Sequence, residues 1–157
     1  GFTLHKVVKE IDAGPIYGQC VFDIANTDNI NNVFINSQLV VERWLPKILL
    51  EALSDKILPV KQDHSKATYF HKRSLIDMEL NINSSKIDII NFIRAHAPPY
   101  TEGAYINFNK SRVHIDSVRA IYPLDSSSNE NIFINDQILK INCKDAQIHL
   151  LISKIVR

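Results

Sequence analysis

A carboxylate within a tight-turn sequence is the side chain of this chain best placed to do chemistry. Asp12 lies in Ile11-Asp12-Ala13-Gly14-Pro15, between two segments of alternating apolar and polar residues at 2–8 and 16–24. A strand that delivers a carboxylate to a turn at a sheet edge is one way in which an α/β enzyme presents a titratable group. The same residues also suit a structural turn, because Asp bonds nearby backbone, Gly accepts a positive φ and Pro fixes the exit direction. A catalytic and a structural Asp12 both remain open.

A second polar cluster, His71-Lys72-Arg73, lies in an irregular stretch at 59–74. Two flexible cations beside a histidine offer several donors to a phosphate. Solvated linker charges are the alternative, and we favour it because exposed cations commonly have no specific partner.

Metal chemistry is not expected. Cys20 and Cys143 are the only two cysteines, they lie far apart, and they follow no metal-ligand spacing. We expect two buried or half-buried thiols in a reducing cytoplasm. No apolar run approaches the length that spans a membrane, so no membrane partner is predicted. The chain begins with Gly rather than Met and opens directly in a strand pattern, and we therefore expect it to be a piece of a longer polypeptide.

Helical spacing predicts two amphipathic helices that must position these groups. The first follows a cap at Thr27-Asp28 and repeats apolar residues at three and four through 30–52, with Trp44 as a core anchor. Pro46 should bend this helix or split it. Ser84-Ser85 caps the second, which ends before Pro98-Pro99. Its buried face is expected to comprise Ile87, Ile90 and Ile93.

The rest of the chain alternates in the manner of short strands. The expected strands lie at 104–109, 112–122, 132–134, 138–142 and 148–156, with a tight turn at Asn109-Lys110-Ser111 and a polar loop at 125–131. This number of short antiparallel strands favours a small barrel or sandwich. We therefore divide the chain into part of an α/β layer structure at 1–62, a linker at 63–83 and an all-β domain at 84–157.

The charge balance bears on the class of partner. Of 157 residues, 45% are hydrophobic and 22% charged, with a net charge of +1, which is a normal globular composition. From Lys86 to Arg157 there are nine Lys or Arg residues against seven Asp or Glu residues, without a run of like charge. A strong nucleic-acid binder usually carries a basic stripe that neutralises several phosphates.

Several pieces of the sequence, taken in their order and spacing, resemble the formyltransferases that use N10-formyltetrahydrofolate. These pieces are Gly1-Phe-Thr-Leu-His5, Asp12-Ala-Gly-Pro-Ile16, Gln19, Ala67-Thr-Tyr-Phe-His-Lys-Arg73, Ile93-Arg94-Ala95 with Pro98-Pro99-Tyr100, and Gly103-Ala104-Tyr105. The resemblance implies an α/β plus all-β fold, namely the C-terminal half of a Rossmann-like formyltransferase domain followed by a small OB-like β-barrel domain.

The resemblance also implies site residues. The family's active site uses an Asn and a His two positions apart on an upstream strand, and an Asp on a later turn. Asp12 matches that Asp, and the other two residues have no match in this chain. The resemblance implies that Asp12 is catalytic, that Glu10, Ile11 and Asp12 line the folate pocket, largely through backbone groups, and that the isolated chain is inactive.

Three further residues match family positions. His5 is expected to be a structural histidine that bonds a neighbouring strand, with a direct catalytic part as the alternative. Gln19 is expected to satisfy buried backbone. Arg94 is expected to bond helix carbonyls or a carboxylate at the domain junction.

The acceptor amine is less defined than the folate donor. A nucleotide-linked amino sugar is the favoured acceptor, because the charge at 86–157 is nearly balanced and Thr68-Tyr-Phe-His-Lys-Arg73 is closer to the motif of the sugar enzymes. Initiator methionyl-tRNA is the alternative. A further alternative, from another class, is a non-catalytic OB-like binding module that stacks bases on Tyr100, Tyr105, Phe108, Tyr122 or Phe133.

Overall fold

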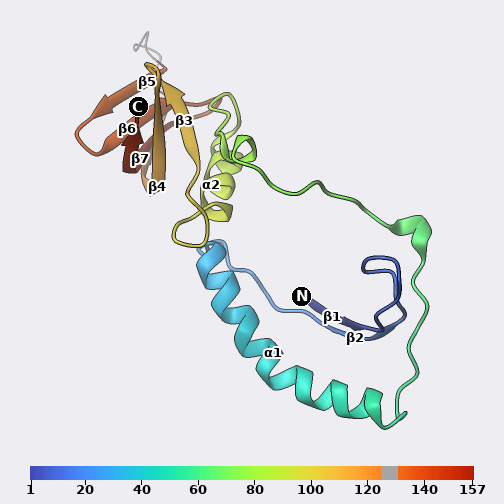
Figure 1. Ribbon diagram of the computed structural model, residues 1–157. Coiled ribbons are helices and arrows are strands. Elements are labelled where there is room, and N and C mark those ends of the chain that lie inside the picture. Colours follow the sequence, from blue (N-terminus) through green and yellow to red (C-terminus); the bar gives the residue numbers. More distant parts are fainter. Residues whose placement is uncertain (125–130) are drawn as a thin grey trace. The chain divides into compact units, whose positions relative to one another are not determined.

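The computed structural model describes residues 1–124 and 131–157, and it divides into two compact units. The first unit comprises residues 1–27 and 32–72, and the second comprises residues 28–31 and 73–157 (Figure 1). Most of the predicted polar loop at 125–131 lies outside the described residues. In the described part of the chain, every helix is too short or too polar to cross a membrane.

The first unit is built on a two-stranded antiparallel sheet. β1 (Phe2–His5) pairs with β2 (Ile16–Cys20), and the register shifts between Leu4 and His5. β1 ends at His5, directly after this irregularity, and β2 ends at Cys20, opposite Phe2, so both strands are shorter than the alternation at 2–8 and 16–24 predicts. Val60 adds one more backbone pairing, in which Ile16 and Val60 exchange two hydrogen bonds of 2.8 Å.

Helix α1 (Ile30–Leu53) confirms the predicted helix. It runs unbroken through Pro46, so the prediction of a split is wrong: one missing backbone donor is tolerated within 24 residues. The half-buried Trp44 and Ile48 lie against β2 at Gly18, where an added Cβ would be 2.9 Å from Ile48 Cδ1. Two 3₁₀ helices follow, η1 (His64–Lys66) and η2 (Ile76–Met78).

Helix α2 (Lys86–Ala95) begins at the predicted cap. The Ser85 hydroxyl accepts a 3.2 Å hydrogen bond from the Asp88 N–H. The buried residues are Ile89 and Ile93, whereas Ile87 is 61% exposed, so the predicted face of this helix is wrong by part of a turn. Adjacent isoleucines at 89 and 90 allow two helical stripes, and the sequence alone does not choose between them.

The other elements of the second unit form one antiparallel sheet in the order β3-β4-β7-β6-β5. Its strands are β3 (Tyr105–Phe108), β4 (Ser111–Tyr122), β5 (Ile132–Asn135), β6 (Ile138–Asn142) and β7 (Gln147–Val156). All five predicted strands are confirmed. Asn109 and Lys110 both have positive φ, as a tight hairpin turn requires.

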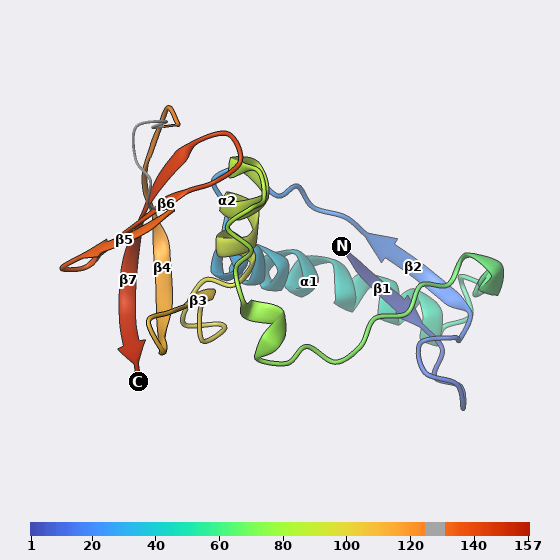
Figure 2. The same cartoon turned by 90° about the horizontal axis from the view of Figure 1, so that it is seen from above.

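The core of the second unit lies between this sheet and α2 (Figure 2). Alternate strand residues such as Ile115, Leu139, Ile148 and Leu150 are fully buried and pack with Ile89 of α2. Strand β4 carries register shifts between His114 and Ala120, and such irregularities bend a sheet. Strands β3 and β5 are the two edges of the sheet, and in the described residues they do not pair with each other.

A buried histidine makes the stability of the second unit depend on pH. His114 is 1% exposed, and its Nδ1–H donates a 3.0 Å hydrogen bond to the Glu102 carbonyl. Burial lowers the pKa of His114, and the nearby cations Lys154 and Arg112 act in the same direction. Burial also lowers the pKa of His149, with Lys140 and Arg119 adding to the effect.

We expect acid to destabilise the second unit. The unfolded chain takes up these protons more readily than the folded one, so the free energy of unfolding is highest above the ordinary histidine pKa of about 6.5 and decreases as the pH falls below it. Urea unfolding that is monitored by hydrogen exchange, at a series of pH values from about 7.5 to about 5, measures this decrease in the free energy of unfolding. His114→Gln should flatten the pH dependence; an unchanged slope would show that other groups carry it.

Candidate functional site

The turn that carries Asp12 is held against the end of β1. Residues 6–15 connect the two strands, and the Lys6 N–H donates a 2.9 Å hydrogen bond to the Pro15 carbonyl. Gly14 is buried at this crossing, where an added Cβ would overlap the Lys6 carbonyl oxygen and lie 2.7 Å from the carbonyl carbon. Glycine is therefore required at position 14 by close backbone approach.

Asp12 occupies the left-handed region with a φ of 53°. Its carboxylate is 86% exposed, and Oδ1 lies 3.6 Å from His5 Nε2. His5 Nδ1 lies 3.1 Å from the Lys6 carbonyl oxygen, which is an acceptor only. The ring therefore donates from Nδ1 to the backbone while Nε2 faces the carboxylate. His5 bonds its own neighbour and pairs with Asp12, so the expected bond to a neighbouring strand is wrong.

A glutamine from a distant segment clamps the same turn. Gln62 Nε2 donates a 2.7 Å hydrogen bond to the Asp12 carbonyl and a 2.6 Å hydrogen bond to the Gly14 carbonyl. The backbone pairing of Val60 with Ile16 brings Gln62 to this place. Nothing in the sequence singles out Gln62, because a polar residue in an irregular stretch carries no periodic signal.

These groups line a pocket of about 360 Å³ in the first unit. The lining residues are Thr3, His5, Asp12, Ile16, Gln19 and Gln62. Gln19 donates a 2.9 Å hydrogen bond to the Thr3 hydroxyl and is exposed, so the expectation that it satisfies buried backbone is wrong. The pocket combines one carboxylate, one imidazole and neutral amides. Such a set can accept a proton and pass it on, but it offers few strong donors to a developing oxyanion.

The predicted folate-contacting residues lie on the same turn. Glu10 is exposed, and Ile11 is 92% exposed. In the described residues, no group of three or more His, Cys, Asp or Glu side chains is arranged to hold a metal ion. Cys20 is half-buried and Cys143 is buried, and both are free thiols.

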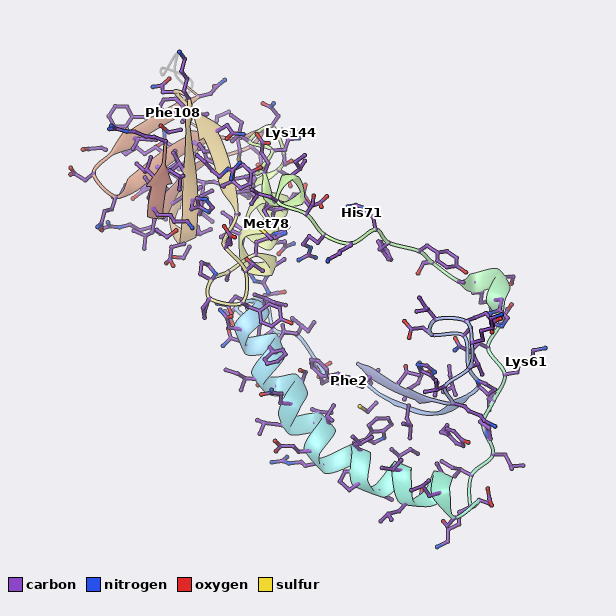
Figure 3. The ribbon with its side chains drawn as sticks, viewed as in Figure 1. Phe2, Lys61, His71, Met78, Phe108 and Lys144 are labelled. Atoms are coloured by element: carbon purple, nitrogen blue, oxygen red, sulfur yellow. The ribbon has the colours of Figure 1, made fainter. Side chains whose placement is uncertain are left out.

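The other predicted residues, His71-Lys72-Arg73 and Arg94, lie outside this pocket. His71 lies in the extended segment between η1 and η2, and His71, Lys72 and Arg73 are all exposed (Figure 3). Arg94 belongs to the second unit, where its Nε donates to the Asp28 carbonyl at 2.5 Å and Nη1 donates to Asn91 Oδ1 at 3.0 Å. Arg94 therefore bonds a backbone carbonyl just before α1, as well as a side-chain amide of its own helix.

Known proteins are similar to this chain in sequence and in fold. The chain is 30% identical over 142 residues to a methionyl-tRNA formyltransferase of Mycoplasma mycoides subsp. mycoides, and the matched region covers 90% of this chain and 43% of that protein. No family model matches the chain.

Two solved structures have the same fold. The N-formyltransferase of Helicobacter canadensis, solved with folinic acid and dTDP-3-aminofucose, matches with a TM-score of 0.70 at 20% identity, over 96% of this chain and 54% of that one. A methionyl-tRNA formyltransferase of Clostridium thermocellum matches with a TM-score of 0.61 at 19% identity, over 93% of this chain and 54% of that one. The chain thus spans about half the length of these proteins. It belongs to the formyltransferase family that includes methionyl-tRNA formyltransferases and sugar N-formyltransferases.

Proposed function

We propose that this chain is the C-terminal part of an enzyme that moves a formyl group from N10-formyltetrahydrofolate to the primary amine of a nucleotide-linked amino sugar. The observation that carries the proposal is the Asp12 carboxylate beside His5, on a glycine-dependent turn that opens into a pocket, in a chain of the formyltransferase family. In this assignment residues 1–62 are the end of a Rossmann-like catalytic domain, 63–83 a linker and 84–157 an OB-like domain. The enzyme is expected to be cytoplasmic, as its folate donor is.

The turn that carries Asp12 supplies one of the two things that formyl transfer to an amine requires. When an amine attacks a formyl carbon, an oxyanion and an ammonium form together, so the site needs donors for the first and a path for the proton of the second. Asp12 is exposed and 3.6 Å from His5, so it can take up the ammonium proton directly or through water and hold the imidazole in place. Donors for the oxyanion must come from elsewhere, and we therefore expect the isolated chain to be inactive.

The folate donor would supply the formyl carbon, and the turn offers a place for its flat heterocycle. Glu10 and Ile11 are exposed beside Asp12, so their backbone is accessible to the edge of a ring. The Helicobacter canadensis enzyme, which shares this fold, was solved with folinic acid, a related folate. Glu10, Ile11 and Asp12 are thus the proposed folate-contacting residues.

Two observations support a sugar acceptor. The second part of the chain has nine basic and seven acidic residues from 86 to 157, and Lys154 is further paired with Glu102 at 3.9 Å. A surface without a basic stripe gains little from counterion release on RNA. The fold match to the sugar N-formyltransferase is also the higher of the two, at 0.70 against 0.61.

Methionyl-tRNA remains the second candidate acceptor, because the 30% identical relative is a methionyl-tRNA formyltransferase. A non-catalytic OB-like module is a third candidate, and it has less support: Tyr105 is 2% exposed, and no basic stripe accompanies the more exposed Tyr100, Tyr122 and Phe133. Binding of single-stranded nucleic acid combines stacking aromatic residues with a positively charged groove.

The test is a formylation assay with the full polypeptide that carries this chain. We expect formyl transfer from N10-formyltetrahydrofolate to a dTDP-linked amino sugar, followed by mass spectrometry of the product, and none to charged initiator tRNA. RNA binding is expected to be weak at every salt concentration. Formylation of the tRNA, with an affinity that falls steeply as salt rises, would assign the second candidate. RNA binding without any transfer would assign the third.

A further inference from the structure

Gln62 is the structural link between the segment after α1 and the turn that carries Asp12. Its side-chain nitrogen lies 2.7 Å from the Asp12 carbonyl oxygen and 2.6 Å from the Gly14 carbonyl oxygen. The side chain is half-buried in the pocket that also contains Asp12 and His5. Its neighbour Lys61 marks this segment in Figure 3.

The orientation of this amide is fixed by what it contacts. Carbonyl oxygens only accept hydrogen bonds, and a glutamine amide has two N–H groups on one nitrogen. Both hydrogens of Gln62 are therefore directed at the turn, one to each carbonyl. The backbone exchange between Val60 and Ile16, at 2.8 Å in both directions, anchors the segment two residues earlier.

The turn needs such support. Asp12 has a φ of 53°, a region that residues with a Cβ rarely occupy and that persists when surrounding contacts hold it. The carbonyls of Asp12 and Gly14, on either side of Ala13, accept hydrogen bonds from the same amide. Gln62 therefore restrains the backbone of the turn on both sides of Ala13, including Asp12 itself. Within the described residues, the 86% exposed carboxylate pairs with His5 at 3.6 Å, a distance that is too long to fix its position alone.

We propose that Gln62 is a positioning residue for Asp12: by holding the Asp12 and Gly14 carbonyls it sets the turn in which the carboxylate faces His5. Gln62 does not contact the reacting atoms in this scheme. The inference rests on the proposed function of Asp12, and the turn's own geometry provides a test that does not depend on it.

The kinetic test uses Gln62→Met in the full polypeptide. Methionine keeps the length of the side chain and removes both donors, so the turn loses its clamp. We expect kcat to fall by about tenfold to about 100-fold, as for other small displacements of a reacting group, with little change in the KM of either substrate. Gln62→Glu, which has the same shape but presents a second acceptor to the carbonyls, should lose at least as much. Gln38→Met, the same change on the exposed face of α1, is the matched control and should behave as wild type.

Two further measurements separate positioning from general destabilisation. In an Asp12→Asn background, Gln62→Met should cost no additional activity, because the group that it positions is already gone. In the 157-residue chain itself, Gln62→Met should accelerate hydrogen exchange in peptides covering residues 9–18 and leave the second unit unchanged.

The outcomes distinguish a failure of the positioning role of Gln62 from a failure of the proposed function. A Gln62→Met enzyme with wild-type kcat, or an additive loss in the double variant, overturns the positioning role. Full polypeptide that transfers no formyl group to any acceptor overturns the proposed function instead; the exchange measurement then decides whether Gln62 holds the turn, and unchanged exchange at 9–18 overturns the inference.

Discussion

Replacing Asp12 with asparagine in the full polypeptide is expected to lower kcat for formyl transfer by a factor of about 10² to 10⁴, the usual contribution of general acid–base catalysis. Asparagine has the same shape as aspartate but cannot take up a proton at neutral pH. It also tolerates the left-handed conformation that Asp12 adopts at a φ of 53°, so the turn should survive the change. The clamp by Gln62 acts on the Asp12 carbonyl and is unaffected.

The measurement is steady-state kinetics with both substrates varied. KM for the folate donor should change little, because the turn is expected to contact the donor largely through its backbone. Asp23→Asn is the matched control, since Asp23 is an exposed aspartate just beyond β2 and outside the pocket. If the Asp12→Asn enzyme turns over as fast as wild type, Asp12 only shapes the turn and the proposed mechanism is wrong.

Most strands and turns of the second unit could be predicted from the sequence, because they depend on residues that are close together in the chain. Alternating residues predict β4, β6 and β7 closely, and Asn109 indicates the hairpin turn because asparagine tolerates positive φ. Lys110 also has a positive φ, which its residue type does not predict. The face of α2 was not predictable, because isoleucines at 87, 89, 90 and 93 satisfy more than one helical stripe. Contact with the sheet selects Ile89 and Ile93 as the buried residues of α2, and this contact cannot be read from the spacing of apolar residues in the sequence.

The candidate site could also be predicted only in part from the sequence. Asp12 could be singled out from sequence because aspartate, glycine and proline identify a turn whatever their surroundings. Gln62 could not, because it reaches Asp12 from 50 residues away and depends on the single backbone pairing of Val60 with Ile16. The contacts of His5 could not be predicted either, because a register shift between Leu4 and His5 decides which neighbours its side chain meets. Gln19 bonds Thr3, its cross-strand partner, and the sequence alone does not specify that pairing.

The chemical character of the pocket also limits what this part of the chain can do. Its polar groups are one carboxylate, one imidazole, two amides and a threonine hydroxyl, and the amides already donate to Thr3 or to the turn. A site of this kind suits proton uptake from an amine better than stabilisation of an oxyanion. The division of labour that we propose, with the oxyanion donors elsewhere in the full polypeptide, follows from this composition.

Gly14→Ala is expected to have the largest effect on the first unit. An alanine Cβ would overlap the Lys6 carbonyl oxygen, and neither backbone can move aside easily, because the Lys6 N–H is bonded to the Pro15 carbonyl at 2.9 Å. We expect a loss of about 3 kcal/mol or more in the stability of the turn and the β1–β2 pair, at the upper end of the overpacking range. Activity of the full polypeptide should be lost with it, because the Gly14 carbonyl is one of the two that Gln62 holds.

Gly18→Ala is the matched control for this substitution. Its Cβ would lie 2.9 Å from Ile48 Cδ1, the end of a flexible side chain that can change rotamer, so the cost should be much smaller. Hydrogen exchange in the two variants makes the comparison, with peptides of the second unit as the internal reference. Equal protection of residues 2–20 in Gly14→Ala and wild type would mean that the turn can open away from Lys6 without loss, and the close backbone approach would then not be what places Asp12 beside His5.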